Sequence, residues 1–284
     1  MPRRCCPSAL PPPIAHPRKT EDAALRSLMG KVERERGLVL SSYKQPCLRR
    51  RLAVRMRARG VPTYAAYATV LDRTPEEYDQ LLDALNINVT NFFRNPETFA
   101  LLRERVVPRL WAAPGPVAVW SAGCASGEEP YSLAILFAEQ ARTAAGLRAR
   151  LRIDATDLDP TALETLRRGE YPAAAVEDVP PALRERFLPD GPPYRVDAGL
   201  ARVVHPLAHD LTWQPAPQPP YQLVVCRNVV IYFDRTTQER LFTTFADALE
   251  PGGLLLLGKV ETLFGPARER FELEEPRERL YVRR

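Results

Sequence analysis

The sequence predicts an α/β protein in which a small all-helical N-terminal domain precedes a doubly wound domain. Two observations predict this fold class. Between residues 21 and 109 the apolar residues recur three or four positions apart, as in helices, and no strand pattern interrupts them. After the stretch 112–116, short apolar runs alternate with helical stretches, which is typical of a parallel sheet covered by helices. A chain of 284 residues is long enough for two hydrophobic cores.

The N-terminal part of the chain divides into a tail and a helical domain. The first residues are rich in proline and lack the continuous apolar run of a signal peptide, so we expect a disordered tail at 1–20. We expect the helical domain at 21–90 and an interdomain segment at 91–116, and we expect Thr74 to cap a helix that begins at Pro75. The predicted helix core comprises Leu25, Leu28, Met29, Val32, Leu48, Leu52, Met56, Tyr78, Leu81, Leu82 and Leu85.

The second domain is expected at 117–284. Its predicted strands lie at 117–120, 151–155, 201–204, 223–226 and 254–257, and its predicted helices lie at 129–141, 160–168 and 235–249. A parallel sheet of this kind binds ligands at the carboxyl ends of its strands. Two β-prone pieces at 194–196 and 202–204 follow the turn Gly191-Pro192-Pro193, so we expect a small β-hairpin subdomain at about 190–204.

The composition excludes several classes of protein. Apolar runs such as 254–257 are too short to cross a bilayer, so we expect no membrane insertion. The five cysteines are scattered and include no C-x-x-C pair, which predicts reduced thiols, a cytoplasmic location and no metal site. A net charge of +5 favours an acidic partner.

A turn of small residues follows the first predicted strand. In this turn Gly123 and Gly127 allow the backbone to approach a ligand, although a tight strand–helix connection would need the same residues. Glu128 would repel a phosphate at the start of the next helix, and it favours a ligand with positive charge, such as S-adenosylmethionine. After the second strand, Asp157 is the candidate for binding ribose hydroxyls, whereas Asp159 is expected to cap the helix that begins at Pro160.

Four separated segments then resemble the signature segments of CheR-type methyltransferases. They are NVTNFFR (88–94), WSAGCASGEEPYS (120–132), ATDLD (155–159) and CRNVVIYF (226–233). With the helical domain, the resemblance covers residues 21–283. It implies a Rossmann-like class I methyltransferase domain that uses S-adenosylmethionine, releases S-adenosylhomocysteine and forms methyl esters on glutamates of chemoreceptors, in adaptation during chemotaxis.

The resemblance also implies site residues. Asp210 stands where some relatives have Asn. Arg94 and Tyr232 would face the methyl group and the incoming carboxylate, as catalytic residues. The implied cofactor-binding residues, with Gly123 added from the turn, are Asn88, Thr90, Arg94, Gly123, Glu128, Asp157, Asp210, Leu211, Arg227 and Asn228.

The chemistry needs little from the protein beyond positioning. A glutamate with a pKa of roughly 4.3 is already an anion at neutral pH, so no general base is required. The task that remains is to align carboxylate, methyl carbon and sulfur and to exclude water. The planar guanidinium group of Arg94 can orient a carboxylate through two N–H donors. Alignment of the cofactor is an alternative role for Arg94.

An arginine-rich stretch at 49–59 is the candidate for substrate recognition. Arg51, Arg55 and Arg59 form one row on the predicted helix, beside the apolar row Leu48, Leu52 and Met56. Such a row is usually a solvated face, but the resemblance implies docking on the acidic methylation region of a chemoreceptor. Nucleic acid is the rival partner, and we expect none because interleaved aromatic residues and a recognised motif are missing.

The chain departs from the family pattern at two places. Gly258-Lys259-Val260-Glu261 replaces Gly-His-Ser-Glu, which leaves the receptor class and the acceptor open. The compact segment 190–204 suggests that the protein does not depend on a receptor's C-terminal pentapeptide tether. Two other functions remain: the same chemistry on a carboxylate in a non-chemotaxis signalling pathway, and a non-catalytic scaffold. Retention of Arg94, Asp157 and Tyr232 argues against the scaffold.

Overall fold

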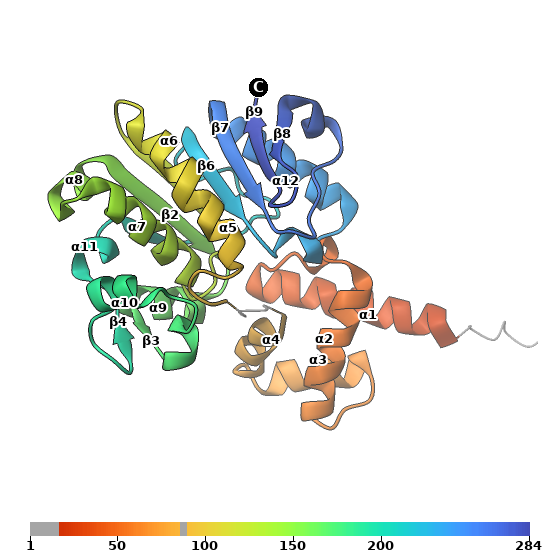
Figure 1. The fold of residues 1–284 in the computed structure, drawn as a ribbon. Helices are drawn as coiled ribbons and strands as arrows, with labels where there is room; N and C mark the ends of the chain where they lie inside the picture. Colours follow the sequence, from red (N-terminus) through yellow and green to blue (C-terminus); the bar gives the residue numbers. More distant parts are fainter. Residues whose placement is uncertain (1–16, 86–89) are drawn as a thin grey trace, which may run out of the picture.

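The computed structural model describes residues 17–85 and 90–284, with side chains from residue 20 onward apart from that of residue 83. A helical domain lies below a twisted sheet that is covered by helices on both faces (Figure 1). Nearly all of the predicted tail and the candidate Asn88 lie outside the described residues.

Four α-helices and a short 3-10 helix form the helical domain. Their bounds are α1 (Pro17–Arg36), η1 (Leu40–Ser42), α2 (Gln45–Ala58), α3 (Tyr64–Arg73) and α4 (Glu77–Leu85). All predicted core positions except the half-buried Leu82 are buried, so the helical spacing identified the core correctly. Thr74 ends α3 instead of capping the next helix, and α4 begins at Glu77.

The second domain is built on a mixed seven-stranded sheet with the order β5-β2-β1-β6-β7-β9-β8. The first five strands in this order are parallel to one another. β9 runs antiparallel to β7, and β8 runs antiparallel to β9. The strands are β1 (Val117–Ala122), β2 (Leu151–Asp157), β5 (Val204–Ala208), β6 (Tyr221–Cys226), β7 (Leu249–Leu257), β8 (Phe271–Glu275) and β9 (Leu280–Arg283).

The strand sequences explain why both faces of this sheet are covered. Successive side chains of a strand point to opposite faces. In β1, Val117 and Val119 join one hydrophobic cluster and Trp120 joins the other, and the leucines of β7 alternate in the same way. The chain therefore needs helices on both faces, which is the doubly wound arrangement predicted from the sequence.

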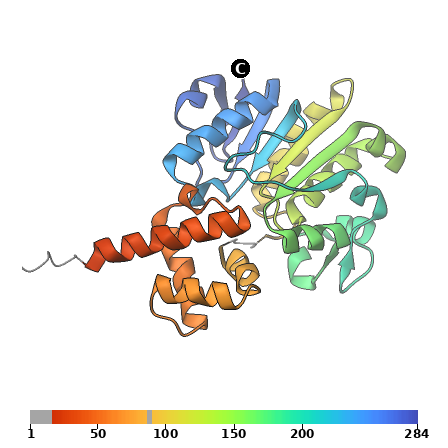
Figure 2. The same cartoon turned by 180° about the vertical axis from the view of Figure 1, so that it is seen from behind.

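The covering helices divide between the two faces. Figure 1 shows α5, α6 and α7 in front of the sheet, and Figure 2 shows α12 over the opposite face. The helices around the sheet are α5 (Pro96–Leu101), η2 (Leu102–Val106), α6 (Val107–Ala112), α7 (Glu128–Ala141), α8 (Ala144–Arg150), α9 (Pro160–Arg168), η4 (Val230–Tyr232), α12 (Arg235–Ala248) and η5 (Pro266–Arg270). Among the described residues, no helix combines the length and apolar character needed to cross a membrane.

The predicted hairpin at 190–204 is wrong. The short strand β4 (Tyr194–Arg195) pairs with β3 (Glu170–Tyr171), and this two-stranded sheet stands beside η3 (Ala173–Val176) and α10 (Pro181–Phe187). The loop after β4 forms α11 (Ala198–Ala201), whose first turn is capped by the Asp197 side chain, which accepts from the Gly199 N–H. Of the residues expected in the second hairpin strand, Arg202 and Val203 form the turn after α11, and Val204 begins β5. The predicted strand at 201–204 therefore starts only at Val204, as β5 of the main sheet.

Candidate functional site

The candidate site lies where the strand order reverses. β1 continues to β2 on one side, and β6 pairs with β1 on the other, so the loops after β1 and β6 diverge and leave a crevice. Two adjoining cavities fill this crevice and share Gly123, Ala125, Asn228 and Val229. The first cavity also borders the helical domain, through Tyr43 and Leu85. The site is therefore built by both domains.

Gly123 allows the close approach of two loops in this crevice. Its φ of +79° lies in the left-handed region, and an added Cβ would lie 2.5 Å from a methyl group of Val229. The N–H groups of Gly123 and Cys124 both donate to the Thr156 carbonyl, at 2.8 and 2.9 Å, which fixes the turn against β2. The glycine predicted from the sequence is thus a structural requirement of the crevice and also lines both cavities.

Asp157 and Asp159 lie close together in the sequence but make different contacts. The Asp157 carboxylate lines the first cavity and accepts from the N–H of Ala125 at 2.8 Å and of Asp159 at 3.0 Å. Burial raises the pKa of Asp157, and these N–H donors oppose the shift. Asp159 caps α9 by accepting from Thr161 and Ala162, which confirms its predicted role.

Asp210 and Leu211 follow β5 and also line the first cavity. Asp210 Oδ1 accepts from the N–H and hydroxyl of Thr212, whereas its Oδ2 is buried and has no hydrogen-bond partner within the described chain. A buried acceptor without a partner is costly, and an amino group of a ligand would satisfy it. Leu211 beside it offers an apolar surface for a flat ring. These residues fit the adenosine part of S-adenosylmethionine.

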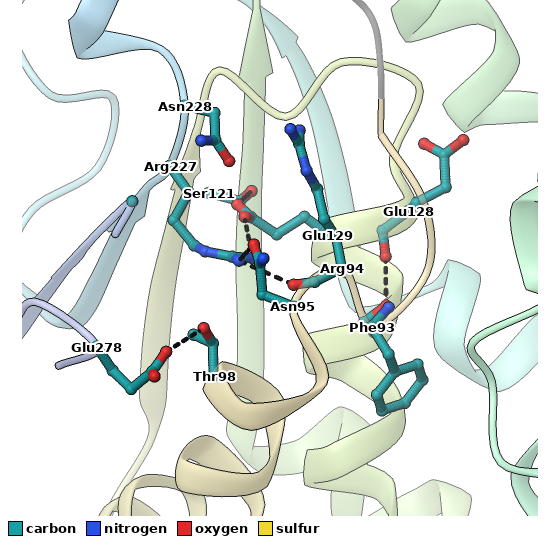
Figure 3. A network of polar contacts seen from close by, with 12 residues as sticks. Phe93, Arg94, Asn95, Thr98, Ser121, Glu128, Glu129, Arg227, Asn228 and Glu278 are labelled. Carbon is teal, nitrogen blue, oxygen red and sulfur yellow. Dashed lines mark hydrogen bonds and ion pairs between the residues drawn. The ribbon is translucent and has the colours of Figure 1, made fainter. Parts of the chain in front are cut away.

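The second cavity contains Glu129 and not Glu128. Glu129 Oε1 accepts from the Ser121 hydroxyl at 2.9 Å, and its Oε2 lies 3.4 Å from Arg227 Nη1. Glu128 lines a separate cavity, where it accepts from the Ser126 hydroxyl at 2.8 Å. Figure 3 shows the Glu129 carboxylate directed toward Arg227 and the Glu128 carboxylate directed away from it. Glu129, and not the predicted Glu128, therefore lies beside Arg227 in the second cavity, because consecutive side chains of a helix point about 100° apart.

Arg94 and Arg227 bring positive charge to the second cavity, beside Thr90 and Asn91. Arg227 donates to the Arg94 carbonyl at 2.8 Å and to Asn95 Oδ1 at 2.7 Å, so it fixes the segment that carries Arg94 (Figure 3). Burial raises the pKa of Glu129, while the charges of Arg227 and Arg94 oppose this shift. Arg94 therefore lies close enough to Glu129 to influence its charge.

The loop after β6 carries Asn228 and Tyr232 and is held by a carboxylate that the sequence interpretation missed. Glu261 is buried and accepts from the N–H groups of Gly258, Asn228 and Ile231, at 2.7, 3.0 and 3.2 Å. This loop places Asn228 in both cavities and Tyr232 in the first. Burial raises the pKa of Tyr232, so its hydroxyl is protonated at neutral pH and can donate a hydrogen bond.

Comparison with known proteins identifies the family. A family model described as "CheR methyltransferase, SAM binding domain" matches residues 88–279, and "CheR methyltransferase, all-alpha domain" matches residues 23–85. The chain belongs to the CheR methyltransferase family. It is a methyltransferase with S-adenosylmethionine as its cofactor, and its helical domain and Rossmann-like domain are those of the family.

Curated relatives agree with the CheR assignment. The chain is 34% identical to "Chemotaxis protein methyltransferase" of Klebsiella aerogenes over 251 residues, which cover 84% of this chain and 83% of the relative. It is 33% identical to the protein of the same name from Escherichia coli K12, over 89% of this chain and 88% of the relative. Among solved structures, the N-methyltransferase NodS of Bradyrhizobium japonicum is 16% identical, with a TM-score of 0.36 over 68% of this chain and 97% of that protein.

The arginine row Arg51, Arg55 and Arg59, which the sequence suggested as a docking face, makes contacts within the protein. Glu77 is fully buried, and it accepts from Arg55 Nε and Nη2, from Arg59 Nε and from the Tyr67 hydroxyl. Arg51 is buried as well. Arg51 and Arg55 are therefore turned away from solvent, and Arg55 and Arg59 pair with Glu77 of α4, because a buried carboxylate requires positive partners. The exposed arginines of this helix are Arg50 and Arg57, and Arg59 is partly exposed.

Lys259, which stands where many relatives have His, lies outside both cavities. Its Nζ lies 3.2 Å from Glu97 of α5 and 3.2 Å from Glu278 in the turn between β8 and β9. The neighbouring Val260 is 74% exposed. Within the described ranges, no group of His, Cys, Asp or Glu side chains could hold a metal ion.

The raised pKa of Glu128 predicts how the stability of the folded protein depends on pH. Burial raises the pKa of Glu128 from 4.5 to about 7, although the Ser126 hydroxyl opposes the shift. Because the folded pKa exceeds the unfolded one, the stabilisation from protonated Glu128 is complete below pH 4.5 and is lost as the pH rises through about 7. We expect Glu128→Gln, which cannot ionise, to be more stable than the wild type at pH 8 by about 2–3 kcal/mol, with little difference at pH 4.5.

Urea unfolding at the two pH values measures this difference. The matched control is Glu104→Gln, because Glu104 is exposed on η2, and it should leave the unfolding free energy unchanged at both pH values. A difference between Glu128→Gln and the wild type that is the same at pH 4.5 and pH 8 would contradict the buried, neutral carboxyl.

Proposed function

We propose that the protein transfers the methyl group of S-adenosylmethionine to glutamate carboxylates of chemoreceptors and produces glutamyl methyl esters. Support comes from the curated relatives, which carry the name chemotaxis protein methyltransferase. The observation that carries the proposal is the placement of Arg94, Asn228 and Tyr232 at two adjoining cavities. Arg94 lines the second cavity, and the loop after β6 brings Asn228 to both cavities and Tyr232 to the first. This combination offers a cation for a carboxylate substrate beside a nucleoside site.

The residues of the two cavities fit the parts of the cofactor. In the first cavity, Asp157 would accept from the ribose hydroxyls, and Asp210 Oδ2 from the adenine amino group, with Leu211 against the ring. In the second cavity, Glu129 would bind the amino group of the methionine part, in place of Glu128. Gly123 and Asn228 line both cavities and would contact the centre of the molecule. When bound, the cofactor supplies a methyl group on a positively charged sulfur.

The acceptor glutamate requires orientation and not deprotonation. Its carboxylate is an anion at neutral pH, since the ordinary pKa is roughly 4.3. Arg94 would orient this carboxylate by charge and by its paired N–H donors, and the neutral Tyr232 hydroxyl would donate a hydrogen bond beside it. Tyr43 and Phe233 lie edge to face at 5.3 Å across the two domains and help to exclude water from the first cavity.

The receptor region that reaches the site lies in the cytoplasm under this proposal, and it is acidic. We assign its recognition to the exposed side of α2, where Arg50 and Arg57 lie beside the partly exposed Arg59. Arg51 and Arg55 would act from within the domain.

A C-terminal pentapeptide tether is not required in this proposal. An extended peptide would add to the edge of the β3–β4 sheet, but each of its strands has only two residues and offers few main-chain hydrogen-bonding groups. Titration of the protein with the pentapeptide should show no tight binding. Tight binding that is lost when β3 and β4 are altered would contradict this part of the proposal.

Peptide mapping tests the acceptor. A receptor cytoplasmic fragment incubated with the enzyme and S-adenosylmethionine should gain the mass of one methylene group on glutamates of its methylation region. The control is the same fragment with those glutamates replaced by aspartate, which should remain unmodified. Unmodified wild-type fragment together with methyl esters on another protein would favour the alternative acceptor, which the replacement of His-Ser by Lys259-Val260 leaves open.

A further inference from the structure

Arg51 belongs to the helical domain but contacts the catalytic loop. Its guanidinium carbon lies 5.0 Å from the centre of the Tyr232 ring, and only 8% of the residue is exposed. A guanidinium over an aromatic face is attracted by the ring, and more strongly where water is excluded. The contact therefore connects α2 to Tyr232, on the wall of the first cavity.

The same guanidinium is anchored at the end of α4. Arg51 Nη1 donates to the carbonyl of Ala84 at 3.0 Å and to the carbonyl of Leu85. These carbonyls belong to the last turn of the helix, where a positive charge is favourable. Arg51 is thus held from one side by α4 and presents its face to Tyr232 on the other, so its position is fixed.

Other contacts hold the backbone of this loop, whereas Arg51 contacts the Tyr232 ring. The Lys44 N–H donates to the Tyr232 carbonyl at 2.9 Å, Lys44 Nζ to the Ile231 carbonyl at 2.9 Å, and the Asp234 N–H to the Ser42 carbonyl at 2.8 Å. They tie the main chain to the helical domain, whereas the contact with Arg51 is with the side chain that faces the cavity. The two kinds of contact can be separated by mutation.

We propose that Arg51 is a positioning residue, whose guanidinium holds the Tyr232 ring in place beside the reacting groups. The helical domain then takes part in catalysis as well as in receptor docking. This inference rests on the function proposed above, because it assigns Tyr232 to the methyl-transfer site. It also explains why Arg51 is buried, although a docking residue would have to be exposed.

Kinetics of three variants separate positioning from docking. Arg51→Met keeps the length of the side chain but removes the charge, and we expect kcat to fall about tenfold with little change in KM for a receptor fragment. Arg51→Lys keeps the charge and should restore part of the loss. Arg50→Met, at the exposed neighbouring arginine of the same helix, should instead raise KM and leave kcat unchanged. A raised KM with unchanged kcat in Arg51→Met would overturn the proposal.

A double-mutant cycle examines the ring contact directly. Tyr232→Phe keeps the aromatic face but removes the hydroxyl that the ring positions, so Arg51→Met should reduce kcat less in that background than in the wild type. Tyr232→Leu removes the face, and Arg51→Met should then have no further effect on kcat. Equal effects of Arg51→Met in all three backgrounds would show that Arg51 does not act through the ring.

A spectroscopic measurement needs no acceptor and distinguishes this inference from the proposed function. Fluorine NMR of fluorotyrosine-labelled protein, with the Tyr232 resonance assigned by Tyr232→Phe, reports on the environment of the ring. Arg51→Met should shift and broaden this resonance, while Arg50→Met leaves it unchanged. If the wild type fails to methylate receptors but the shift is observed, the function is contradicted and the Arg51–Tyr232 contact stands. An unchanged resonance in correctly folded Arg51→Met overturns the inference whatever the acceptor is.

Discussion

Arg94→Ala should lower kcat for methyl transfer by about 100-fold, the largest effect that we expect from a single substitution. The side chain lines the second cavity, and its charge influences both Glu129 and Tyr232. Without a cation at this position, the incoming carboxylate loses the group that orients it. Single-turnover kinetics with saturating cofactor measure the effect on the chemical step.

Two comparisons make the Arg94 result specific. Arg103→Ala removes another arginine of the same region, one that is half exposed and pairs with Glu139 at 2.6 Å, and it should leave kcat unchanged. The affinity of Arg94→Ala for S-adenosylhomocysteine separates its two candidate roles. Unchanged affinity supports orientation of the substrate, and a loss of affinity equal to the loss in kcat/KM supports alignment of the cofactor. Wild-type turnover in Arg94→Ala would contradict any catalytic role.

Asp157→Ala should weaken the binding of S-adenosylhomocysteine by about 10- to 150-fold. This range corresponds to the loss of hydrogen bonds to a charged group, about 1.5–3 kcal/mol. Asp157 faces the first cavity while its carboxylate is held by the N–H groups of Ala125 and Asp159. Calorimetric titration of the folded variant gives the affinity directly.

The matched control for Asp157 lies two residues further along the chain. Asp159→Ala removes the cap of α9 and should cost about 1 kcal/mol of stability, with a much smaller effect on the affinity. Asp157→Asn keeps the shape of the side chain and should fall between the wild type and Asp157→Ala. Unchanged affinity in Asp157→Ala would show that the ribose lies elsewhere.

The fold was predictable because its main evidence is local. Apolar residues at successive positions of β1 and β7 indicate that both faces of the sheet are covered. The spacing of Leu25, Leu28 and Val32 indicates that one face of their helix is buried. The hairpin at 190–204 was not predictable in the same way. Tyr194 pairs with Tyr171, far away in the sequence, and no local pattern indicates a partner at that distance.

The limits of the site prediction have the same physical origin. Glu128 and Glu129 are chemically identical, and only the exact position at which α7 begins decides which of them faces the second cavity. The arginine row of α2 has the spacing of an exposed face, but the buried Glu77 on another helix attracts two of its members. Glu261 is retained from the Gly-His-Ser-Glu pattern, but its role was not predictable because its hydrogen bonds go to three backbone N–H groups, which are present at almost every residue.

The most direct test of the central claim follows the transferred methyl group. Receptor cytoplasmic fragments are incubated with the protein and radiolabelled S-adenosylmethionine, and the isolated fragments are then treated with mild alkali. We predict that label appears on the fragments and is released as methanol, because a glutamyl methyl ester hydrolyses under these conditions. Cofactor binding without any transfer, or label that resists alkali, would contradict carboxyl methylation of these receptors by this protein.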